Sequence, residues 1–79
     1  MTLDKHELQG IGRIKRRTMP RSEFETLLAD HGYYRTGSAP ANGGRLKVWY
    51  GHATYDPIES IHSGDGRIVI TAYHPAPEL

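Results

Sequence analysis

The run Arg67 to Tyr73, RIVITAY, constrains the fold more than any other stretch of this chain. Four of its seven residues are β-branched and one is aromatic, a composition suited to a pleated, half-buried surface. Apolar residues fall on both parities of the two-residue repeat, which indicates a strand covered on both faces. Two glycines and an aspartate in residues 63–66 are typical of a hairpin turn, and Pro75 and Pro77 end the ladder. We therefore expect residues 67–73 to be the central strand of a small sheet.

Length and composition predict a single domain. The chain has 79 residues, enough for one small core, and it contains no cysteine, which excludes disulfides and thiolate metal sites. It has neither an apolar run of about 20 residues, as a membrane span needs, nor an apolar leader near its start. We expect one domain over residues 1–79, located in the cytoplasm and without a membrane partner.

Charge is unevenly distributed along the chain, although the net charge is only +1. Residues 1–21 carry six basic and two acidic side chains, whereas residues 22–79 carry four basic and seven acidic ones. This polarity favours an anionic partner for the first segment, most often a nucleic acid, but a solvated helix face would have the same composition.

Two helices are expected in the first part of the chain. Apolar residues recur at spacings of three to four over residues 4–17, although Gly10 and Gly12 each cost about 1 kcal/mol relative to alanine inside a helix, so a break near Gly10 is an equally good alternative. A second helix is predicted over residues 23–31. Ser22 and Glu25 match a capping box, and Gly32 suits the left-handed position that ends a helix.

Strand patterns follow the second helix. Residues 33–36 are short and aromatic, residues 45–50 alternate between two faces, and residues 58–62 form a weaker strand before the hairpin. Residues 37–44 (GSAPANGG) are expected to form a mobile loop. The predicted fold is α+β, with two N-terminal helices packed on one face of a small, mostly antiparallel sheet of about four strands.

Residues that could carry chemistry point to RNA and not to a metal or a cofactor. The five histidines show no metal-ligand spacing, and nucleotide-binding loops are missing from the sequence, so we expect no cofactor. Histidine, arginine, lysine and tyrosine together supply the proton transfers and cations that RNA cleavage without a metal requires. His6 and the end of the last strand, at Thr71, Tyr73 and His74, would meet if the first helix packs across the sheet.

The same residue types also suit binding without catalysis. Trp49 with Arg45 and Lys47 on one strand face offers an aromatic ring between cations, a combination used for stacking on bases or as an interface anchor. An equally good alternative is that Trp49 covers the underside of the helices.

The order of several residues resembles a family of small bacterial proteins. Its pattern is a histidine-led helix with spaced arginines, an R-G-I-S-type start to the second helix and a closing strand of the form D-G-x-I-V-V-T-x-Y. His6, Arg13, Arg17 and residues 65–73 follow this order, and residues 19–24 lead into a capped helix. The sequence departs from the pattern at residues 17–22 (RTMPRS), where R-G-I-S is usual. That family is similar to the compact ribonuclease toxins that share a fold with barnase, RelE and the colicin nucleases. The resemblance implies a toxin-like, metal-independent endoribonuclease or an RNA-binding relative of one. The catalytic residues it implies are His6, Arg13, Arg17, Thr71 and Tyr73.

Two other classes of function remain open. One is an inhibitor encoded by a phage or mobile element, of the anti-CRISPR type, that blocks a nucleic-acid-binding machine by protein contact. The other is a nucleic-acid-binding module without activity. The expected partners are RNA or a nucleic-acid-binding protein complex, with a cognate antidote protein in the case of a toxin. The residues expected to bind the nucleic acid or partner are Lys15, Arg16, Arg21, Arg45, Lys47 and Trp49.

Overall fold

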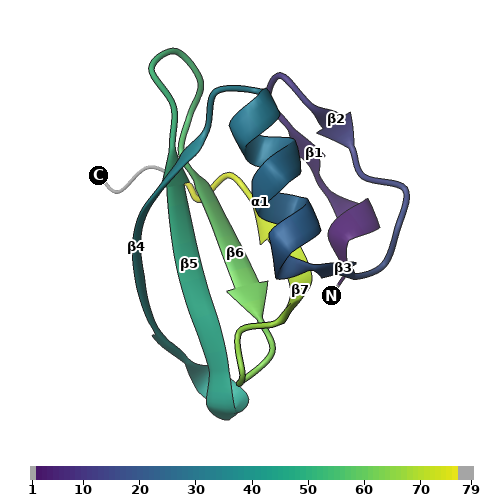
Figure 1. Ribbon diagram of the computed structural model, residues 1–79, viewed down its shortest axis with the longest axis vertical. Helices are drawn as coiled ribbons and strands as arrows, with labels where there is room; N and C mark the ends of the chain where they lie inside the picture. The colour runs from purple at the N-terminus through teal and green to yellow at the C-terminus, as the bar shows by residue number, and fades with distance from the viewer. Residues whose placement is uncertain (1, 77–79) are drawn as a thin grey trace.

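A computed structural model describes residues 2–76 as one helix packed on a five-stranded antiparallel sheet (Figure 1). The strand order is β3-β7-β6-β5-β4. The strands are β3 (Met19–Pro20), β4 (Tyr34–Ala41), β5 (Arg45–Gly51), β6 (Ile58–His62) and β7 (Ile68–Tyr73). The helix, α1 (Arg21–Asp30), covers one face of this sheet. Ahead of it lie a 3-10 helix, η1 (Leu3–Lys5), and a two-stranded sheet of β1 (Glu7–Leu8) and β2 (Gly12–Arg13).

The predicted fold of two N-terminal helices on about four strands is wrong. Where the first helix was expected, the chain forms η1 and the β1–β2 hairpin. Gly10 and Gly12 both have positive φ, at 79° and 92°, a conformation that no α-helix contains and that glycine adopts without strain. Leu8 and Ile14 are still buried, so the apolar spacing reflects a hairpin packed on the core.

Helix α1 confirms the second predicted helix, but not its cap. It begins at Arg21, directly after β3, and Pro20 at the N-cap position makes no side-chain capping bond. Instead the Arg21 amide donates to the Arg67 carbonyl at 2.7 Å, which ties the helix start to the sheet. Gly32 ends the helix at φ 86° as predicted, and its amide donates to the Ala29 carbonyl.

The long edge strand replaces the loop expected at residues 37–44. β4 continues through Ala41, paired with β5, and only Asn42–Gly44 make a short 3-10 turn, η2. Pro40 is tolerated because β4 lies at the edge of the sheet, where one side of the strand needs no donor. β7 confirms the RIVITAY strand, although the middle position of the five belongs to β6.

The core lies between α1 and the sheet. Phe24 of α1 is fully buried and meets the ring of Tyr50 edge-on at a centroid distance of 5.7 Å and that of His62 at 6.4 Å. Two polar residues of β6 share this core. The Ser60 hydroxyl donates to the Val48 carbonyl at 3.0 Å, so the His62 Nε2, 2.8 Å from the Ser60 oxygen, carries the proton and donates to it.

His62 predicts a loss of stability in mild acid. Burial lowers the pKa of His62 below the usual 6.5, although the Gly66 backbone and Glu25 partly oppose this effect. The unfolded chain therefore takes up the proton first, and the free energy of unfolding should decrease as the pH falls below about 6.5. Urea denaturation at a series of pH values measures this decrease.

A matched variant separates His62 from the exposed histidines. His31→Gln, at the exposed end of α1, should leave the pH dependence unchanged, whereas His62→Gln should reduce it. An NMR titration of the wild-type rings gives a second readout if His62→Gln does not fold. A His62 ring that gains its proton at or above pH 6.5 in the folded protein would contradict the prediction.

No helix within residues 2–76 is long and apolar enough to cross a lipid bilayer.

Candidate functional site

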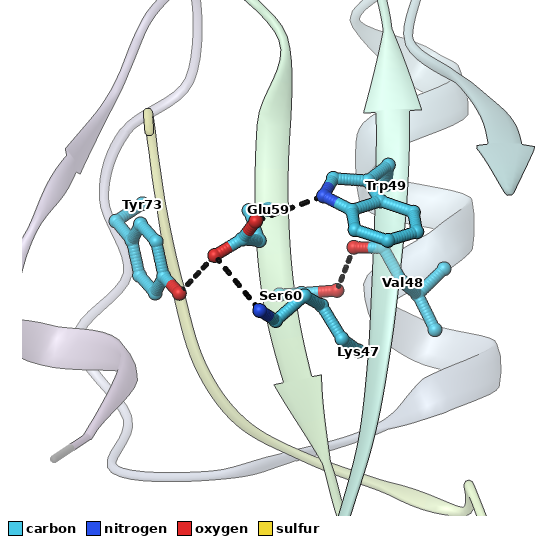
Figure 2. A network of polar contacts seen from close by, with 6 residues as sticks. All are labelled: Lys47, Val48, Trp49, Glu59, Ser60 and Tyr73. Carbon is cyan, nitrogen blue, oxygen red and sulfur yellow. Dashed lines mark hydrogen bonds and ion pairs between the residues drawn. The ribbon is translucent and has the colours of Figure 1, made fainter. Parts of the chain in front are cut away.

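The sheet face opposite α1, called here the open face, presents a row of three side chains from three neighbouring strands (Figure 2). Trp49 of β5 lies opposite Glu59 of β6, and Glu59 lies opposite Tyr73 of β7. Side chains alternate along a strand, so burial of Ile58, Ser60 and His62 under α1 directs Glu59 to the open face. We refer to Trp49, Glu59 and Tyr73 as the row.

Glu59 is the centre of the row, because each of its neighbours contacts its carboxylate. The Trp49 Nε1 donates to Glu59 Oε1 at 2.8 Å, and the Tyr73 hydroxyl donates to Oε2. The Lys47 ammonium, one position along β5 on the same face, lies 3.9 Å from Oε2. The Glu59 side chain is only 16% exposed, so these contacts act in a partly desolvated environment.

The electrostatics of the row keep Glu59 charged and Tyr73 neutral. Burial alone would raise the pKa of Glu59, but the hydrogen bonds from Tyr73 and Trp49 and the Lys47 charge outweigh it, and the pKa lies below its usual value. Burial and the bond to Glu59 raise the pKa of Tyr73 to about 12. At neutral pH the row therefore contains a carboxylate that can accept a proton and a phenol that donates a hydrogen bond.

His6 joins the row from the N-terminal segment. Its exposed ring meets the Tyr73 ring edge-on, with 5.8 Å between the centroids. The segment is held there by the buried Leu3, whose amide donates to the Arg17 carbonyl, and by Thr71, whose hydroxyl donates to the Thr2 carbonyl at 3.0 Å. Tyr73 thus contacts both His6 and Glu59.

The five residues that the resemblance implied as catalytic are only partly brought together. His6 and Tyr73 are in contact, as described. Thr71 lies beside them, but it is fully buried and its hydroxyl holds the N-terminal segment. Arg13 is exposed on β2 opposite Glu7, and Arg17 is exposed in the connection to β3. Within residues 2–76 no hydrogen bond or ion pair joins either arginine side chain to the row.

The residues predicted to bind a nucleic acid or partner fall into two groups. Arg45, Lys47 and Trp49 share the open face, as the alternation predicted, and the first two line a hollow of about 210 Å³. This hollow borders the row at Tyr73, and its lining also includes Ala41, Asn42 and Ile61.

The other group lies around the start of α1. Lys15 is exposed, Arg21 is half-buried in the first turn, and Arg16 pairs with Glu23 at 2.8 Å. No contact joins this group to the row in the part of the chain that the structure describes. The residues predicted to bind a nucleic acid or partner therefore lie on two separate surfaces.

Glu59 is the residue that sequence reasoning missed. Its signal was an acidic residue inside a predicted strand, where glutamate is mildly depleted. Alternation of the kind predicted for residues 45–50 also applies to residues 58–62, where it puts Glu59 on the face opposite Ile58 and Ser60.

A larger hollow, of about 610 Å³, lies at the β1–β2 hairpin and does not resemble a reaction centre. His74 is its one titratable ring, and both ring nitrogens are engaged, because Nε2 accepts from the Gln9 amide at 2.9 Å and Nδ1 lies 3.0 Å from the Pro57 carbonyl. Among residues 2–76 no group of three or more histidine or acidic side chains is arranged to hold a metal ion. We therefore regard the row with His6 and Lys47 as the candidate site.

Comparisons with protein-family models, with curated proteins and with solved structures give no significant match to this chain, so the function is argued from the site itself.

Proposed function

We propose that the protein is a small, toxin-like endoribonuclease that cleaves RNA without a metal ion, with its reaction centre on the open face. The observation that carries the proposal is that Tyr73 contacts an imidazole and a charged carboxylate at once, beside an ammonium group. These are the three kinds of group that phosphodiester transesterification requires: a base, an acid and a cation for the phosphate. We also propose that the protein acts on this RNA in the cytoplasm.

In this mechanism the charged Glu59 is the base. It removes the proton of the ribose 2′-hydroxyl, and the 2′-oxygen attacks the adjacent phosphorus. The bond from phosphorus to the 5′-oxygen breaks and leaves a 2′,3′-cyclic phosphate. A protonated His6 gives its proton to the departing 5′-oxygen, the part of a general acid. Lys47 stabilises the negative charge that develops on the phosphate oxygens.

Tyr73 is a positioning residue in this scheme. Its raised pKa keeps the hydroxyl protonated, so it holds the Glu59 carboxylate while its ring supports His6. A carboxylate has about four acceptor positions. Glu59 can therefore receive the ribose proton while it still accepts bonds from Tyr73 and Trp49.

The test is cleavage of a single-stranded RNA and of total tRNA by the purified protein in EDTA. We expect cutting that leaves 2′,3′-cyclic phosphate ends, and a rate about 100-fold lower for His6→Ala, the size of effect that loss of a general acid produces. His31→Ala is the matched control, because this exposed histidine lies at the end of α1 and not on the open face.

Two outcomes would refute the proposal. One is the absence of cutting at micromolar concentrations of correctly folded protein. The other is cutting that His6→Ala leaves at the wild-type rate. The first result would favour the inhibitor class, and a pull-down for a large protein partner would then follow.

A further inference from the structure

Trp49, at one end of the row, and Tyr34 of the edge strand occupy neighbouring positions on the open face. Tyr34 of β4 is opposite Gly51 of β5, and Gly51 follows Trp49 by two positions, so all three residues belong to the same face. Tyr34 is 60% exposed, more than any other large hydrophobic residue of residues 2–76. Trp49 is half-buried and is fixed by its bond to Glu59.

A glycine lies beside each of these rings. A Cβ atom on Gly51 would lie 3.3 Å from Cζ of Tyr34 and 3.1 Å from Cγ2 of Thr36, so the Tyr34 ring lies close over the backbone of β5. A Cβ atom on Gly37, opposite Trp49, would lie 3.7 Å from Cε3 of the indole. Each ring therefore rests beside a residue without a side chain.

Cations continue the same face along β5. Lys47 and Arg45 precede Trp49 at intervals of two, so they share its face, and Arg45 is exposed. An aromatic surface bordered by cations matches the chemistry of a nucleic acid strand, in which flat bases alternate with a charged backbone.

We propose that Trp49 and Tyr34 stack two successive unpaired bases of an RNA strand, while Lys47 and Arg45 contact its phosphates. The platform admits single strands and disfavours duplexes, because paired bases cannot present their flat faces to it. This inference deepens the proposed function and takes the RNA ligand from it. The binding step itself is independent of cleavage.

The single tryptophan of the chain allows a direct test, because its fluorescence reports on this face alone. The probe is a single-stranded DNA oligonucleotide, which lacks the 2′-hydroxyl and is not cleaved by the proposed reaction. We expect saturable quenching of Trp49, and binding at least about tenfold weaker for a duplex of the same sequence. Affinity should also decrease as salt is added.

Tyr34 provides the matched pair of variants. Tyr34→Ala should weaken binding about tenfold, whereas Tyr34→Phe, which keeps the ring, should bind as the wild type does. Equal affinity for duplex and single strand, or an unchanged affinity for Tyr34→Ala, would overturn the inference. Absence of quenching by any nucleic acid would also overturn it, and would leave the face as a protein-docking surface.

The two proposals fail separately. Quenching without cleavage of RNA would keep the platform and reject the nuclease. Cleavage of RNA with no quenching by single-stranded DNA or by a 2′-O-methyl RNA of the same sequence would keep the nuclease and reject the platform.

Discussion

Glu59→Gln is expected to reduce RNA cleavage by about 10²–10⁴-fold, the range found when a general acid or base is removed. The amide keeps the size of the carboxylate. Its oxygen can still accept the Trp49 bond and its NH2 can donate to the Tyr73 hydroxyl, but it cannot take a proton from the 2′-hydroxyl. Single-turnover cleavage of a short RNA in EDTA measures the change. Its free energy of unfolding should stay close to the wild-type value.

Glu23→Gln is the matched control for this variant. Glu23 is exposed on α1 and pairs with Arg16, so the same chemical change there leaves the open face untouched. An exposed pair contributes about 0–1 kcal/mol, and cleavage should be unchanged. If Glu59→Gln cleaves RNA as fast as Glu23→Gln does, Glu59 is not the base.

The strands show which features of the fold a local sequence pattern can predict. Alternation over residues 45–50 predicted correctly that Leu46, Val48 and Tyr50 share one face and Trp49 the other. The strand at residues 58–62 has the bounds that were predicted. These predictions succeeded because a period of two is set by the strand itself, whatever lies on either side.

The first segment shows where local pattern fails. Spacings of three to four suit a helix, but they also occur when a hairpin buries Leu8 and Ile14 against a sheet. Gly10 and Gly12 distinguish these two structures. Both adopt positive φ, which glycine reaches without strain, whereas glycine in a helix interior is destabilising.

The prediction of a loop over residues 37–44 was also wrong. Glycine, proline and small residues disfavour strands, yet β4 pairs with β5 along its length and lies at an edge, where such residues are accepted. Whether a strand is central or at an edge depends on the whole topology, which local composition does not contain.

The candidate site was predicted only in part, because its residues lie far apart in the sequence. His6 and Tyr73 were both named, but their contact depends on η1 packing against β7. Glu59 was missed because its partners come from two other strands, and register between strands is a long-range property.

Phe24→Ala is expected to cost about 3–5 kcal/mol of folding free energy, the usual result of truncating a buried phenylalanine. Phe24 is fully buried between Tyr50 and His62, and a backbone fixed on both sides cannot collapse into the space that the ring leaves. A domain of this size has a total stability near the lower end of about 5–15 kcal/mol, so much of the variant should unfold near body temperature. Urea and thermal denaturation measure the loss.

Leu27→Ala is the control for Phe24→Ala, because Leu27 lies on the same helix but is only partly buried, and it should cost clearly less. Equal costs would show that α1 does not depend on the Phe24 contact. Phe24→Ala and Glu59→Gln together separate the effect on folding from the effect on the reaction. Phe24 packs against the α1 face of the sheet, and the row lies on the opposite face. The folded fraction of Phe24→Ala should therefore cleave RNA at the wild-type rate in the cold. Glu59→Gln should be fully folded and inactive at the same temperature, since only its chemistry is removed.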